Sequence, residues 1–209
     1  MDSDVTFEGP PIDDRGTLDR VPLDLRALLE QRNGYVAFRG GLHVRGASVA
    51  PTWHSLGYWW FSDDSIHRQF TVVQSTDVPF AQDALGDQFL LRDGEVHRLL
   101  AETGELQPLG MGLAGFLDAS NRDPIGFLSL EPLERFLANG GTLAPGQLLS
   151  IYPPFVFAES QGGVTIKAIS VAERIAFLSK LAKAVTEAQD GTRVRFEIDE
   201  EMLRKLTNG

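Results

Sequence analysis

VPFAQDALGDQFLLRDGEVHRL, residues 78–99, is the stretch of sequence that determines the fold class. Within it, the apolar segments 88–92 and 96–99 flank Asp93-Gly94. Asp-Gly between two such segments is among the strongest local signals for a β-hairpin, because both turn residues take positive φ. The stretch therefore predicts antiparallel strands joined by tight turns, and Thr103-Gly104 predicts a further reversal.

Upstream of this stretch, the spacing of Leu25, Leu28 and Leu29 predicts one face of a short helix that ends at Asn33-Gly34. Two short strands are predicted at 35–38 and 42–44, around a turn of two glycines.

Downstream, leucine and phenylalanine spacing predicts short helices near 113–117 and 130–137. Strands are predicted at 148–158, broken by Pro153-Pro154, and at 164–169. Ser170 stands three residues before Glu173, which is a capping box, and a helix with apolar positions from 175 to 185 should follow. A last strand is predicted at Arg193 to Ile198.

The order of these elements predicts the fold class and the division of the chain. Strands and helices come in clusters instead of alternating, which is typical of an α+β fold with an antiparallel or mixed sheet flanked by helices. Residues 1–20 are rich in acids and poor in apolar periodicity, so they are predicted to be an extended, partly mobile leader. The main domain is assigned to 21–120, with a smaller C-terminal α/β extension at 121–209 packed on it.

Composition narrows the class of partner. The chain has 209 residues, with 19 Lys and Arg against 29 Asp and Glu, and a formal net charge of −10. Such a field repels polyanions and attracts basic partners, so nucleic acids and anionic membranes are disfavoured. The sequence has no cysteine, its N-terminus carries acids where a signal peptide has a basic region, and no apolar run is long enough to span a membrane. These features predict a cytoplasmic protein.

The segment Trp53 to Phe61 holds all three tryptophans of the chain. The first interpretation is a helix or turn anchored in the core, because aromatic rings bury large areas. The second is a binding anchor that uses Trp59 and Trp60, because tryptophan dominates interface hot spots. Burial of the two side chains distinguishes these interpretations.

Signals for catalysis are sparse. The four histidines (His43, His54, His67 and His97) form no His-x-x-x-His pair, and no Gly-x-Ser-x-Gly elbow occurs. Asp63 and Asp64 stand close to His67, so one alternative is a small metal-dependent hydrolase or ligand-binding enzyme that uses these three residues. Gly110 to Gly115 fits Gly-x-Gly-x-x-Gly but lacks the context of a dinucleotide site, and is interpreted as a connection from strand to helix. No catalytic residue, cofactor or metal is therefore assigned.

The stretch 78–99 also resembles the signature of the SUKH superfamily, which includes the fungal Smi/Knr cell-wall regulators and many bacterial immunity proteins. Residues 28–34 resemble the family's helix ending in Asn-Gly, and 112–117 resemble its short helix after the hairpin. The positions that match the family pattern are Asn33, Gly34, Pro79, Phe80, Gly86, Asp87, Phe89, Asp93 and Gly94. The chain departs from the pattern in an insertion between Val44 and Val78 and in the region after residue 121.

The resemblance implies a SUKH-like fold and a protein that binds and silences a toxin inside the producing cell. It implies protein binding by occlusion. The matching positions themselves have structural reasons to be there, as turn and strand residues. Trp59, Trp60, Asp63 and Asp64 are the candidate contacts with the partner. An acidic inhibitor suits a basic toxin, because electrostatic steering speeds capture. A regulatory scaffold like the fungal members is a further alternative, and the oligomeric state is left open.

Overall fold

The structure is a computed structural model of the chain, and it describes residues 4–188. Its centre is a seven-stranded antiparallel sheet in which each strand pairs with its neighbours in sequence. The strands of this sheet are β1 (Phe7–Glu8), β2 (Tyr35–Ala37), β3 (Leu42–Val44), β4 (Val78–Asp83), β5 (Gln88–Arg92), β6 (Glu95–Leu100) and β7 (Glu105–Pro108). The α+β class with an antiparallel sheet is thereby confirmed.

Helices precede, interrupt and follow the strands of this sheet. The first four are α1 (Arg15–Leu18), α2 (Leu23–Gln31), α3 (Leu56–Phe61) and α4 (Ile66–Gln69). After β7 come α5 (Leu113–Arg122), α6 (Pro124–Leu128) and α7 (Glu131–Ala138). A 3-10 turn, η1 (Phe38–Gly40), joins β2 to β3.

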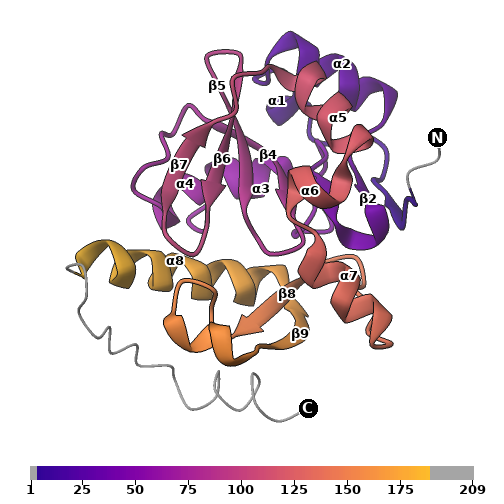
Figure 1. The fold of residues 1–209 in the computed structure, drawn as a ribbon. Helices are drawn as coiled ribbons and strands as arrows, with labels where there is room; N and C mark the ends of the chain where they lie inside the picture. The colour runs from indigo at the N-terminus through magenta and orange to yellow at the C-terminus, as the bar shows by residue number, and fades with distance from the viewer. Residues whose placement is uncertain (1–3, 189–209) are drawn as a thin grey trace.

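The C-terminal part adds a second sheet and the longest described helix. Strands β8 (Gln147–Tyr152) and β9 (Thr165–Ser170) pair antiparallel, with the 3-10 turn η2 (Ala158–Gly162) between them. Helix α8 (Val171–Glu187) then runs across one end of the large sheet (Figure 1). The amide of Leu149 donates to the Ala84 carbonyl at 2.8 Å, which ties β8 to the turn after β4.

Local signals in the sequence are confirmed where the turn or cap is itself local. Asp93 and Gly94 take φ of 52° and 83° between β5 and β6, and Gly104 takes a φ of 73° before β7. The Ser170 hydroxyl accepts from the Glu173 amide at 3.3 Å and donates to its carboxylate at 2.7 Å, so the capping box begins α8 as predicted. The strand predicted at Arg193 to Ile198 lies outside the described residues.

The leader predicted at residues 1–20 is wrong for its described part, because this segment contributes β1 and α1. The Thr6 amide donates to the Val36 carbonyl at 2.9 Å and so extends the edge of the sheet. Leu18 is fully buried at the end of α1, and the Asp14 carboxylate caps that helix through the Thr17 amide at 3.0 Å. The contacts of Thr6 and Leu18 are made with residues distant in the sequence. The acidic composition of residues 1–20, on which the prediction rests, therefore does not reveal them.

Two hydrophobic clusters hold the elements together. One joins the helices α1, α2, α5 and α7 to the large sheet, with Phe80, Phe89 and Phe116 at its centre. The other joins α3, α4 and α8 to the sheet, with Trp59, Leu90 and Leu178 among its members. Residues of β8 enter both clusters, so the C-terminal elements share their core with the sheet.

Candidate functional site

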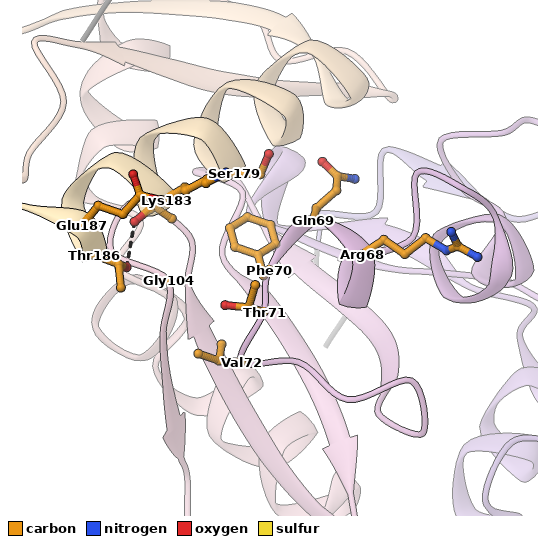
Figure 2. A pocket seen from close by; sticks show the side chains of 11 residues that line it. Arg68, Gln69, Phe70, Thr71, Val72, Gly104, Ser179, Lys183, Thr186 and Glu187 are labelled. Carbon is orange, nitrogen blue, oxygen red and sulfur yellow. Dashed lines mark hydrogen bonds between the residues drawn. The ribbon is translucent and has the colours of Figure 1, made fainter. Parts of the chain in front are cut away.

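A groove lies between the segment that follows α4 and the last turns of α8 (Figure 2). Its volume is about 330 Å³, at the small end of the range of ligand pockets. Residues 68–72 form one wall, and Gly104 with the α8 residues Ser179, Ala182, Lys183, Thr186 and Glu187 forms the other. Phe70 and Ala182 are buried at its base, and Val72 is 44% exposed beside them. The groove therefore combines an apolar base with a polar rim.

The wall at residues 68–72 is fixed in position by contacts with the core and with Arg92. Ile66 and Phe70 are buried in the second cluster, so the backbone between them cannot shift without opening the core. The Val72 carbonyl accepts a hydrogen bond of 3.1 Å from Arg92. The Arg92 guanidinium also binds the buried Asp77 carboxylate with two bonds, of 2.8 and 2.6 Å, and such bidentate pairs fix geometry strongly. This wall is therefore preformed.

The α8 wall is positioned by a close approach to the turn before β7. A Cβ atom at Gly104 would lie 3.2 Å from the Ala182 Cβ, and the φ of Gly104 is positive. The Thr186 hydroxyl lies 2.8 Å from the Ala182 carbonyl and 3.5 Å from that of Thr103. A glycine at 104 thus lets the helix pack directly on the turn.

The charges around the groove are mixed and exposed. Arg68 and Lys183 stand on opposite walls, and Glu187 lies one turn beyond Lys183 on α8. Arg68 pairs with Asp63 at 3.4 Å, but both side chains are largely exposed, so solvent screens the pair. Within residues 4–188, Lys183 makes no ion pair. The rim of the groove therefore carries charges of both signs.

The three residues of the alternative hydrolase hypothesis, Asp63, Asp64 and His67, form no metal-binding group in the described part of the chain. Asp63 pairs with Arg68, and the Asp64 carboxylate accepts from the Tyr58 hydroxyl. That hydrogen bond raises the pKa of Tyr58. In the described part of the chain, no three His, Asp or Glu side chains form a group that could hold a metal ion. The geometry gives the hydrolase alternative no ligand set at Asp63, Asp64 and His67.

The tryptophans proposed as contacts belong to the core. Trp59 and Trp60 are 2% and 6% exposed, and their indole N–H groups donate to the carbonyls of Trp53 and Ser75 at 3.1 and 3.0 Å. The core interpretation of this segment is confirmed, and the two rings cannot serve as surface anchors. The next ring, Phe61, is 42% exposed, with the Arg20 guanidinium 5.1 Å from its centroid. Leu56, Trp59 and Trp60 lie on the buried face of α3, so residue 61 faces outward. A sequence prediction that placed the start of this helix after Ser55 would have indicated the orientation of residue 61.

Positions that match the SUKH pattern have structural roles in this chain. Phe80 and Phe89 pack on Phe116 in the first cluster. The Asn33 side-chain carbonyl accepts from the Ala47 amide at 2.7 Å. The other positions occupy turns or strands: Gly34, Gly86, Asp93 and Gly94 have positive φ, Pro79 lies in β4, and Asp87 accepts from Arg98 at 2.9 Å.

A buried carboxylate that sequence reasoning did not single out organises the turn after β4. Asp83 Oδ1 accepts hydrogen bonds of 2.9 to 3.1 Å from the amides of Leu85, Gly86 and Asp87, and Oδ2 pairs with Arg98 at 2.9 Å. Burial and the Asp87 charge raise the pKa of Asp83 to about 7, against the pull of Arg98 and the amides. The group is structural, because turn amides and Arg98 occupy both of its oxygens.

The glycine pattern at 110–115 forms the connection that the sequence predicts. Gly110 has a φ of 67° after β7, and α5 begins at Leu113. The Met111 carbonyl accepts from the Val96 amide at 2.8 Å, so the loop closes back on β6.

Comparisons of the chain with models of protein families, with curated proteins and with solved structures gave no match. None of the described helices is long and apolar enough to cross a membrane.

Proposed function

We propose that this chain is a protein-binding module that neutralises a cognate toxin by occlusion, with the groove between α4 and α8 as its contact surface. The observation that carries the proposal is a preformed groove with an apolar base and an exposed apolar residue, Val72, on its rim. Preformed surfaces bind tightly because little conformational entropy is lost on association. The resemblance of residues 78–99 to the SUKH signature supports the immunity role.

The partner favoured by charge is a basic protein. A net charge of −10 raises the encounter rate with a positively charged partner, such as a nuclease that binds polyanions. The exposed Asp63 and Asp64 lie on the segment that leads into α4, next to the groove wall. They therefore remain candidate contacts of this surface, whereas the two buried tryptophans do not.

The test is co-expression of the chain with the product of the gene that adjoins its own, as the candidate toxin, scored by growth rescue and by co-purification. Val72→Lys and Ser179→Lys place new positive charges on the two walls, so they should repel a basic partner and weaken binding by about tenfold or more. Ile125→Lys on α6 and Ala176→Lys on α8 are matched controls, because both positions are exposed but neither lines the groove.

The outcomes separate the two parts of the proposal. Rescue by the wild-type chain that fails for both groove variants, and persists for both controls, supports it. No rescue and no co-purifying toxin would overturn the immunity role, and capture of a host protein instead would favour the regulatory scaffold. Rescue that survives both groove variants would place the contact surface elsewhere.

A further inference from the structure

A chain of buried hydrogen bonds crosses the first strands of the large sheet. His43 Nε2 lies 2.9 Å from His54 Nδ1, and His54 Nε2 lies 3.0 Å from the Asn33 carbonyl oxygen. At the other end, the Gln82 amide nitrogen lies 3.3 Å from His43 Nδ1, and its oxygen accepts a bond of 2.7 Å from Arg45. Both histidines are buried, His54 completely.

The donors of this hydrogen-bond chain all point in the same direction along it, and this fixes the position of each proton. The Asn33 carbonyl has no proton to give, so His54 Nε2 donates to it and His54 Nδ1 must accept. His43 Nε2 then donates to His54, and His43 Nδ1 accepts from the Gln82 amide. Both rings are therefore neutral with the proton on Nε2, and both Nδ1 lone pairs are in use. A further proton on either ring would point at a donor and break a bond.

The surroundings offer no charge to stabilise an added proton. The groups that face the pair are the Phe7 ring from the edge strand β1, the Trp53 ring, the Gln82 amide from β4 and the guanidinium of Arg45, the residue after β3. Arg45 is the one charged group among those described that face the rings, and it has the same sign as the proton. Arg45 is itself bound by carbonyls and amides rather than by a carboxylate.

These surroundings lower the pKa of both rings. Burial, the neighbouring ring and Arg45 hold the pKa of His43 well below its ordinary value of 6.5. Burial lowers the pKa of His54 to about 4, although its hydrogen bond to Asn33 opposes the change.

The His54 ring supports the edge of the sheet. A Cβ atom at Gly9, Gly34 or Gly46 would lie 2.5 Å from this ring, so three backbone segments rest directly on it. The Phe7 ring of β1 packs 5.0 Å from His54 and 4.8 Å from Trp53, between ring centroids. Because β1 pairs only two residues with β2, these ring contacts add to the few backbone hydrogen bonds, such as that of the Gly9 amide to the Gly34 carbonyl at 3.0 Å, that hold it on the sheet.

We propose that the His43–His54 pair is an acid-sensitive lock, in which uptake of a proton breaks the hydrogen-bond chain and detaches β1 and the segment 46–55 from the sheet. The remaining strands, β4 to β7, stay paired, because their bonds do not pass through either ring. This inference does not depend on the function proposed above.

The size of the effect follows from proton linkage. The open state binds a proton at the ordinary pKa of 6.5 and the closed state only at about 4, so lowering the pH favours opening. Between pH 7 and pH 5, titration of His54 alone raises the opening equilibrium roughly 20-fold.

The experiment is hydrogen exchange by mass spectrometry on the full chain at pH 7 and pH 5, corrected for the intrinsic rate. Peptides that cover residues 4–12 and 46–56 should lose protection by roughly 20-fold, and peptides from 88–100 should change little. His54→Gln keeps a donor for the Asn33 carbonyl but takes no proton, so its edge should lose this pH response. His97→Gln, at a partly exposed position, is the matched control and should respond like the wild type.

A second measurement tests the proposal even if the His54→Gln variant does not fold. At pH 7, nitrogen NMR of the wild-type protein should show His43 and His54 neutral, with the proton on Nε2. Below pH 5, the same spectra should show proton uptake by the rings, and hydrogen exchange should show loss of protection at the edge of the sheet. A ring that is protonated at pH 6.5 while β1 stays protected would overturn the proposal, and so would equal pH responses of the edge and the central strands.

Discussion

Arg45 is a fully buried cation that is neutralised by no carboxylate in the described part of the chain. It binds the Pro79 carbonyl at 2.6 Å and the side-chain oxygens of Gln82 and Gln88 at 2.7 and 2.6 Å. Its guanidinium lies 5.4 Å from the centroid of the Trp59 ring. Burial lowers the pKa of Arg45 to about 9, so the group stays charged at neutral pH. Neutral acceptors and an aromatic face thus replace the missing anion.

Arg45→Met should lower the free energy of unfolding by about 3 kcal/mol, because three buried oxygens lose their donor. Urea denaturation followed by circular dichroism measures this change. Arg26→Met is the control, since Arg26 forms only exposed pairs with Asp19 and Glu30 and should cost less than about 1 kcal/mol. Equal losses in the two variants would contradict this account of Arg45.

Sequence reasoning at the scale of single residues succeeds only where the partner is near in the chain. Asp93-Gly94 sets its own turn, and Ser170 caps the helix that it begins. Arg45 is different, because its acceptors lie 34 to 43 positions away and no local pattern predicts a buried cation. The same holds for Trp59 and Trp60, whose burial depends on neighbours in other elements.

At the scale of elements, α8 docks on the turn between β4 and β5. The Arg174 guanidinium is buried, donates to the Leu85 carbonyl at 3.1 Å and lies 3.6 Å from the Glu102 carboxylate. Gly86 has a φ of 101°, and a Cβ at this position would lie 2.7 Å from Leu178 Cδ1. The turn can accept the helix because residue 86 carries no side chain.

Gly86→Ala should destabilise the protein by about 3 kcal/mol, because it adds backbone strain and an overlap with α8. Gly94→Ala is the matched control: its φ of 83° is equally strained, but no atom lies within 4 Å of the added Cβ. It should cost about 1 kcal/mol. Thermal unfolding of both variants measures the difference, and a Gly86 variant no weaker than the Gly94 variant would show that close packing of α8 is unimportant.

Elements with periodic apolar faces, such as α2 and α8, were predictable from the sequence, whereas β1 and α1 were not. Two paired residues in β1 and four in α1 are too few to carry a period, and both are stabilised by contacts to distant residues. The groove escaped prediction for a similar reason. Its walls, at residues 68–72 and 179–187, are more than 100 positions apart and meet only in the folded chain.

At the scale of the whole molecule, charge is the property that sequence alone determines. A net charge of −10 should steer a basic partner, and exposed charges are screened over about 8 Å at physiological salt. Steering acts on the rate of encounter more than on the lifetime of the complex.

The association rate constant with the basic partner proposed above should therefore fall at least about tenfold between 0.05 and 0.5 M NaCl, while the dissociation rate constant changes much less. Stopped-flow fluorescence at a series of salt concentrations measures both. The paired variant Asp63→Asn with Asp64→Asn should reduce the salt dependence, and removal of two distant exposed acids, Glu131 and Glu134, should reduce it less. An association rate independent of salt would contradict electrostatic steering.

Because each strand of the large sheet pairs with the next strand in sequence, the sheet can assemble in order as the polypeptide leaves the ribosome. Helix α8 covers the turn after β4 through Arg174, which is synthesised 89 positions after its partner Leu85 in that turn. During translation, the apolar surface that α8 will cover stays exposed to chaperones until α8 itself has left the ribosome.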